Sequence, residues 1–164
     1  MEALTEDAAA ARLGTIQWMH VMDDRAYPTR PFLAASAAVI RDGRVLIVRR
    51  GGTFGRGIYT LPGGVVEAGE TRTDAVIREV QEETGVAIEP VALAGYREMI
   101  MRDDDEKTAR HFVIVCFAAR WVAGEPVPDK TEITEAAWRL PEELDGLKTT
   151  EGLREIIADA MARL

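Results

Sequence analysis

The chain has 164 residues, of which 47% are apolar and 29% are charged, and this composition suits a single globular domain. Its only cysteine, Cys116, excludes an internal disulfide framework and a cysteine-bound zinc, and its two histidines exclude a multi-histidine metal site. The net charge of −8 argues against a nucleic-acid polymer as partner, because binding its phosphates depends on Lys and Arg side chains.

The first residues of the chain are acidic and lack the basic and apolar regions of a signal peptide. No apolar run approaches the ~20 residues that are needed to span a bilayer. We therefore expect a cytoplasmic location and no membrane partner.

Residues 1–31 are predicted to form an N-terminal extension. Within it, residues 8–13 are expected to form a short helix and residues 16–22 a strand, and the prolines at 28 and 31 favour an extended connector. Two alternatives are open: a frayed end, or an arm that packs on a partner subunit. Trp18 and its apolar neighbours favour the arm and thus a homodimer.

The elements expected after residue 31 begin with two strands, 32–40 and 44–50, joined by a hairpin turn at Asp42-Gly43. A glycine-rich loop at 51–57, a short strand at 58–61 and a break at 62–64 follow. Thr71 is expected to cap a helix over 71–84, which Gly85 ends in the left-handed conformation. The apolar stripe of this helix is expected at Ala75, Val76 and Val80, with Ile77 as a weaker member.

Two long strands, 91–102 and 107–121, flank an acidic hairpin tip at 103–106. The second has apolar residues on both sides, which indicates burial on both faces. A strand at 136–140, a helix start at 141–144 and a last helix over 151–164 complete the pattern. The apolar positions of the last helix are Leu153, Ile156, Ile157 and Met161.

The most informative segment lies between Gly64 and Val86. It contains six acidic and two basic residues, so its local charge of −4 is half of the net charge. On a helix, Glu79, Glu82 and Glu83 share one face because they are three and four residues apart. Clustered carboxylates repel unless a cation lies among them, and oxygen ligands suit Mg²⁺ or Mn²⁺. Taken alone, however, this pattern is more often a solvated acidic surface.

The full spacing favours the metal site over the solvated surface. From Gly64 the sequence runs through five residues to Glu70 and through seven more to Arg78-Glu79, and it ends in V-Q-E-E-T-G-V at residue 86. It resembles the Nudix box, G-x5-E-x7-R-E-U-x-E-E-x-G-U with U aliphatic, at every position. The resemblance to the Nudix hydrolase family covers about residues 32–164. It implies an α/β fold: an α/β/α sandwich with a mixed central sheet and the loop and helix of the box.

The resemblance implies hydrolysis of the pyrophosphate bond of a nucleoside diphosphate that is linked to another group. Glu79, or an acid outside the box, would help to deprotonate the attacking water. Arg78 would hold Glu79 by an ion pair, and Glu70 would orient the loop and helix. The groups implied to bind Mg²⁺ or Mn²⁺ are Glu79, Glu82, Glu83 and the backbone carbonyl of Gly64 or Gly63.

Many family members add an acid from a loop late in the sheet. In this chain Glu132 ranks first, because it lies in the loop before a strand, and Glu135 ranks second. Arg50 at a strand end and Arg56 in the glycine-rich loop are candidates for binding substrate. His111 is expected to be a core residue.

The sequence as a whole, with Trp138 followed by P-E-E-L at 141–144 and a turn at 147–151, is similar to short bacterial members described as ADP-ribose pyrophosphatase-like. ADP-ribose or a nucleotide sugar is therefore the first candidate substrate. The alternatives are a nucleoside triphosphate pyrophosphohydrolase that clears damaged nucleotides, and a non-catalytic nucleotide-binding regulator. The complete set of box acids disfavours the regulator.

Overall fold

The computed structural model describes residues 25–164, so the helix and strand expected at 8–13 and 16–22 lie outside the described residues. The strands are β1 (Phe32–Arg41), β2 (Arg44–Arg50), β3 (Tyr59–Thr60), β4 (Gly63–Val65), β5 (Ala87–Arg102), β6 (Thr108–Ala123) and β7 (Ile133–Arg139). The helices are α2 (Arg72–Thr84), the 3-10 turn η1 (Pro141–Leu144) and α3 (Leu153–Met161). Among these described helices, none is long and apolar enough to cross a membrane.

One mixed sheet contains all seven described strands, in the order β3-β2-β1-β6-β5, with β4 paired to β1 and β7 paired to β2. β1 runs parallel to β6 and antiparallel to its other partners. The first half of its other edge pairs with β4, and only its last two residues pair with β2. β1 is therefore the strand that places the short β4 segment in the middle of the molecule.

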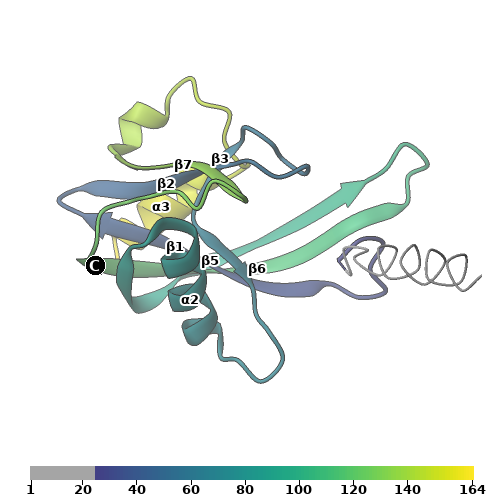
Figure 1. Ribbon diagram of the computed structural model, residues 1–164, viewed down its shortest axis with the longest axis horizontal. Helices are drawn as coiled ribbons and strands as arrows, with labels where there is room; N and C mark the ends of the chain where they lie inside the picture. Colours follow the sequence, from purple (N-terminus) through teal and green to yellow (C-terminus); the bar gives the residue numbers. More distant parts are fainter. Residues whose placement is uncertain (1–24) are drawn as a thin grey trace, which may run out of the picture.

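The two helices cover opposite faces of the sheet, as Figure 1 shows, which gives the predicted α/β/α sandwich. Successive residues of β1 point to opposite faces, so this one strand contributes to both cores. The core beneath α2 includes Ala35, Ala37, Val39, Leu46, Ala75, Val76, Val80 and Phe117. The core beneath α3 includes Ala38, Val45, Ile47, Cys116, Leu144, Leu153, Ile156 and Ile157. Ile77, the weaker member of the predicted stripe, is exposed.

Helix α2 has the two caps that the sequence predicts. The Thr71 hydroxyl accepts a hydrogen bond from the amide of Asp74 (3.0 Å), and Gly85 has a φ of 71°. Thr84 is fully buried; its hydroxyl donates to the carbonyl of Val80 (2.6 Å) and accepts from the amide of Val86 (3.2 Å). This hydroxyl thus connects the last turn of α2 to the chain entering β5.

The break expected at 62–64 is wrong in part, because Gly63–Val65 is the strand β4. A side chain at Gly63 would collide with the sheet, since its Cβ would lie 2.2 Å from the carbonyl oxygen of Ala35. The glycine, which suggested a break from sequence, instead lets this short strand approach β1 closely.

The burial expected on both faces of β6 holds only for its middle, where residues 116–119 are buried. The distal part of the β5–β6 hairpin extends beyond the two helices (Figure 1), and Ile100 in this part is exposed. His111 lies in this part and is not a core residue; it pairs with Glu98 at 3.0 Å.

The described end of the N-terminal extension contacts this hairpin. The amide of Tyr27 donates to the carbonyl of Ala109 (3.0 Å), and its hydroxyl donates to Asp103 (2.9 Å) at the hairpin tip. The division at residue 31 and the partner-binding arm stay predictions.

We expect Thr84→Val to lower the free energy of unfolding by about 1–3 kcal/mol, because the buried Val86 amide loses its acceptor while the side-chain shape is kept. Urea denaturation measures the change. Thr73→Val, at an exposed position of the same helix, should change stability by less than about 0.5 kcal/mol. Equal losses in the two variants would contradict the proposed contribution of the buried hydroxyl.

Candidate active site

The acids of α2 lie against the backbone of β4. The carboxylate of Glu83 accepts a hydrogen bond from the amide of Gly63 (2.9 Å). The carboxylate of Glu79 occupies the space beside Gly64, where a Cβ atom would lie 2.4 Å from its carboxyl carbon. The two glycines therefore bring the backbone of β4 within reach of two carboxylates from successive turns of the helix.

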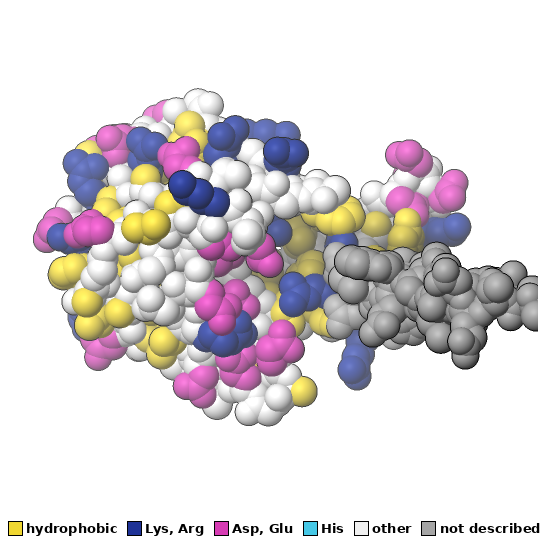
Figure 2. All heavy atoms as spheres, in the orientation of Figure 1, with side chains coloured by type: hydrophobic (Ala, Val, Ile, Leu, Met, Phe, Trp, Pro, Cys, Tyr) yellow, Lys and Arg dark blue, Asp and Glu magenta, His cyan; other side chains and the backbone are white. Residues whose placement is uncertain are grey.

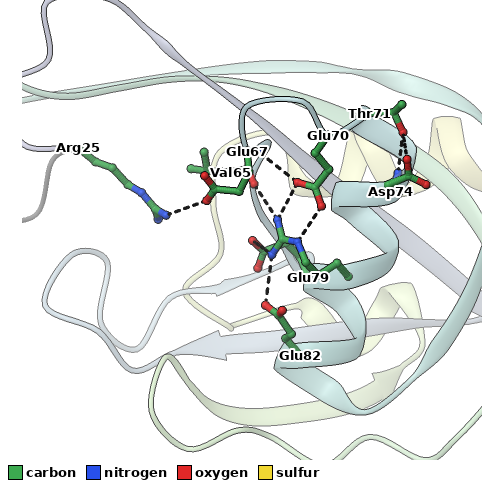
Figure 3. A network of polar contacts seen from close by, with 9 residues as sticks. Arg25, Val65, Glu67, Glu70, Thr71, Asp74, Glu79 and Glu82 are labelled. Atoms are coloured by element: carbon green, nitrogen blue, oxygen red, sulfur yellow. Dashed lines mark hydrogen bonds and ion pairs between the residues drawn. The ribbon is translucent and has the colours of Figure 1, made fainter.

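Arg78 connects three of the box acids. Its guanidinium donates to both carboxylate oxygens of Glu70 (2.8 and 3.0 Å), to Glu79 (2.8 Å) and to Glu82 (3.2 Å). It also donates to the carbonyl of Val65 at 3.2 Å. Figure 3 shows how Glu70, Glu79 and Glu82 converge from the loop and two turns of the helix. A planar guanidinium with five donors is suited to such a junction, whereas an ammonium group is not.

The network has a marked effect on Glu70. The hydrogen bonds from Arg78, supported by the amide of Glu67 (3.1 Å), lower the pKa of Glu70 to about 2. In the other direction, Glu70 and Glu79 raise the pKa of Arg78. Glu70 is thus held ionised, and its two hydrogen bonds with Arg78 connect the loop to the helix.

Glu83 is in a different electrostatic position. Glu83 is only 8% exposed. This burial and, to a smaller extent, the negative charges of Glu79 and Glu132 raise the pKa of its carboxyl to about 8. Burial also raises the pKa of Glu79, although Arg78 opposes this change. Glu83 is therefore a buried carboxylate near the largely covered carboxylate of Glu79, and within residues 25–164 an arginine pairs with Glu79 but not with Glu83.

Glu132 lies close enough to these acids for its negative charge to raise the pKa of both Glu79 and Glu83. It is exposed, and it precedes β7, as the sequence ranking assumed. Glu135, the second choice, lies within β7 and is already paired with Tyr59 and Arg139, each at 2.8 Å.

The two candidate arginines differ in position. Arg50, at the end of β2, is close enough for its charge to lower the pKa of Glu83, and it donates to the carbonyl of Phe54 (3.3 Å). Arg56 is exposed in the glycine-rich loop, and among the described residues it does not join the network of acids. The structure thus brings Arg50 to the site and leaves Arg56 outside it.

No three acids, histidines or cysteines in residues 25–164 stand in a ready-made metal-binding arrangement. Within the predicted set, the Glu82 side chain is 60% exposed and pairs with Arg78. Glu79, Glu83 and the β4 backbone nonetheless offer oxygen atoms at one place, and no cationic side chain of residues 25–164 lies at hydrogen-bond distance from the buried carboxylate of Glu83. This donor set fits a hard divalent cation. Figure 2 shows acidic side chains gathered over α2.

Sequence reasoning missed Asp129, which makes the densest set of side-chain hydrogen bonds in the loop before β7. The spacing D-x-T at 129–131 is a signal that was available, because an Asp side chain commonly accepts hydrogen bonds from amides two and more residues onward.

The NUDIX domain model matches residues 30–160, so the chain belongs to this family. An ADP-ribose pyrophosphatase from Methanocaldococcus jannaschii is 32% identical over 95 residues, 58% of this chain and 54% of that protein. An NAD-capped RNA hydrolase NudC from Vibrio parahaemolyticus is 30% identical over 135 residues, 82% of this chain and 46% of that protein. The chain thus spans about half the length of these curated relatives.

Solved structures agree with the family assignment. A MutT NUDIX hydrolase from Burkholderia pseudomallei has a TM-score of 0.68 and 27% identity, covering 79% of this chain and 98% of that one. A NUDIX hydrolase from Nitrosomonas europaea has a TM-score of 0.65 and 26% identity, covering 81% and 90%. These likenesses confirm the predicted fold and family.

The raised pKa of Glu83 predicts a pH-dependent stability of the metal-free protein. Below about pH 4.5 the carboxyl is protonated in both states; as pH rises towards 8, ionisation favours the unfolded chain. We therefore expect the wild type to lose stability relative to Glu83→Gln over this window, by up to about 1.4 kcal/mol per pH unit. Denaturant unfolding with EDTA at several pH values measures the difference.

Glu82→Gln is the matched control, because it changes an exposed carboxylate on the same helix. It should keep the pH dependence of the wild type. A parallel pH dependence of the wild type and Glu83→Gln would contradict the buried, neutral state of Glu83.

Proposed function

We propose that the chain is a metal-dependent hydrolase that cleaves the pyrophosphate bond of a nucleoside diphosphate linked to another group. The observation that carries the proposal is the pair of carboxylates placed against the glycine backbone of β4, of which Glu83 is buried and Glu79 is largely covered. Buried carboxylates without a full set of basic partners are costly, so a divalent cation is the natural partner for this site.

We further propose that Mg²⁺ or Mn²⁺ is held by Glu79, Glu82, Glu83 and the backbone carbonyl of Gly64. When bound, such an ion neutralises phosphate oxygens and makes hydroxide available near neutral pH. The ion-pair network supports the ligand role of Glu79, because Arg78 and Glu70 fix its carboxylate beside β4.

The remaining roles fall to residues around the buried pair. Glu132 accepts the proton of the attacking water at its carboxylate, because it is exposed and close to both acids. Arg50 binds a phosphate group, because it is a cation facing the same acids from the end of β2. Arg56 contacts the more distant part of the substrate from the glycine-rich loop.

ADP-ribose or a nucleotide sugar is the proposed substrate, and the relative named ADP-ribose pyrophosphatase supports this choice. A nucleoside triphosphate is the alternative, which the relative named MutT-like protein from Streptomyces ambofaciens supports (33% identical over 117 residues, 71% of this chain and 68% of that protein). The small-molecule substrate, the cytoplasmic location and the homodimer remain predictions.

A substrate panel with Mg²⁺ or Mn²⁺ tests the proposal. The panel holds ADP-ribose, a nucleotide sugar, NAD and a nucleoside triphosphate, with products separated by chromatography. We expect ADP-ribose to give AMP and ribose 5-phosphate; a triphosphate cleaved to monophosphate and pyrophosphate would favour the alternative.

Glu83→Gln should lower kcat about 100-fold or more, because the cation that neutralises the charge of the transition state loses one of its proposed ligands.

Glu155→Gln is the control for this panel, because it makes the same chemical change on the exposed surface of α3. It should keep the activity of the wild type. Hydrolysis that Glu83→Gln leaves unchanged would contradict the metal-site assignment, and no hydrolysis of any substrate would contradict the proposed function.

Metal binding also predicts a change in stability. A cation that binds only the folded chain stabilises it by mass action, by about 2.7 kcal/mol at one hundred times its Kd. We expect millimolar Mg²⁺ to raise the melting temperature of the wild type more than that of Glu83→Gln, as measured by thermal denaturation. Equal shifts would contradict a site that includes Glu83.

A further inference from the structure

We propose that Asp129 is a positioning residue that holds Glu132 beside the buried acids of α2. The proposal rests on the function proposed above, in which Glu132 accepts the proton of the attacking water. Glu132 comes from a loop rather than a helix or strand, so its place relative to Glu79 and Glu83 needs a specific restraint. The hydrogen bonds of Asp129 supply that restraint.

The carboxylate of Asp129 binds three successive backbone amides. Its Oδ1 accepts from the amides of Thr131 (3.1 Å), Glu132 (3.2 Å) and Ile133 (2.9 Å). Its Oδ2 accepts from the Thr131 hydroxyl at 2.7 Å and from the Glu132 amide at 3.3 Å. Charge-assisted hydrogen bonds to consecutive amides fix the backbone on both sides of Glu132 and thereby the direction in which its side chain leaves the chain.

The same turn is attached to the end of the metal-binding helix. The amide of Asp129 donates to the carbonyl of Glu83 (3.2 Å), and the amide of Val127 donates to the carbonyl of Thr84 (2.9 Å). The backbone amide of Asp129 therefore binds Glu83, which carries a buried carboxylate, and the side chain of Asp129 binds the amide of Glu132. Asp129 thus links the two acids directly, through its backbone to one and through its side chain to the other.

A third attachment limits the loop from its other side. The carbonyl of Glu132 accepts from the amide of Gly51 (2.7 Å), the residue that follows Arg50. A side chain at Gly51 would contact Thr134 at 2.7 Å and the Glu132 carbonyl at 3.4 Å, so this contact is close. The turn thus joins the end of α2, the start of β7 and the glycine-rich loop at the backbone of Glu132.

The experiment compares Asp129→Ala with Asp129→Asn in steady-state hydrolysis and thermal unfolding. Asparagine keeps Oδ1, which accepts from all three amides, and loses only the Oδ2 acceptor of the Thr131 hydroxyl and the longer Glu132 contact, whereas alanine removes both acceptors. A small misplacement of a catalytic group lowers turnover by up to about 100-fold. We expect Asp129→Ala to lower kcat about 10- to 100-fold with KM nearly unchanged, and Asp129→Asn to stay within about threefold of the wild type.

Asp145→Ala is the matched control, because Asp145 pairs with Arg154 far along the chain from the acids. It should keep the kcat of the wild type. If Asp129→Ala does not fold, Asp129→Asn decides: retained kcat supports the proposal, and a fall as large as that of Glu132→Gln overturns it.

A double variant separates positioning of Glu132 from a general effect on the fold. If Asp129 acts through Glu132, Asp129→Ala should lower kcat no further in a Glu132→Gln background. An equal loss in both backgrounds would overturn the proposal. So would an unchanged kcat of Asp129→Ala in a wild type that hydrolyses its substrate, whereas a wild type inactive on the whole panel would overturn the proposed function itself.

Discussion

The site depends on the close contact between helix α2 and the two glycines of β4. Gly63 lies against β1, where its absent side chain would meet the Ala35 carbonyl at 2.2 Å, and its amide donates to Glu83. Gly64 faces the other way, and Glu79 fills the space beside it. One glycine is required by the sheet and the next by the helix, so any side chain at either position would separate the acids from the backbone they share.

The acids near this contact differ in whether a positive charge compensates them. Arg78 compensates Glu70, Glu79 and Glu82 through one guanidinium. Glu83 has no such partner in the part of the chain that the structure describes, and burial raises the pKa of its carboxyl to about 8. The arginine therefore organises the loop and the exposed side of the helix, and it leaves a deficit of positive charge at the buried side. That deficit, rather than the number of acids, is what suits a divalent cation.

Local sequence signals predicted the elements that local interactions specify. The caps of α2 and its buried stripe follow from residues within one helix, so Thr71, Gly85 and the acids of the box could be placed from the sequence. β4 was expected as a break, because a strand of three residues exists only through its partner β1. The same holds for His111: its pattern suggested a core position, but the hairpin extends past the helices that would have covered it.

The arrangement of the acids depends, more than the elements do, on contacts between residues that are far apart in the sequence. Spacing alone put Glu79, Glu82 and Glu83 on one face of a helix, but it did not reveal that Arg78 draws Glu82 outward while β4 covers Glu83. The negative charge of the chain therefore has two parts with different consequences. The exposed acids make the surface negative, whereas Glu83, which is buried, and Glu79, which is largely covered, form a donor set that fits a divalent cation.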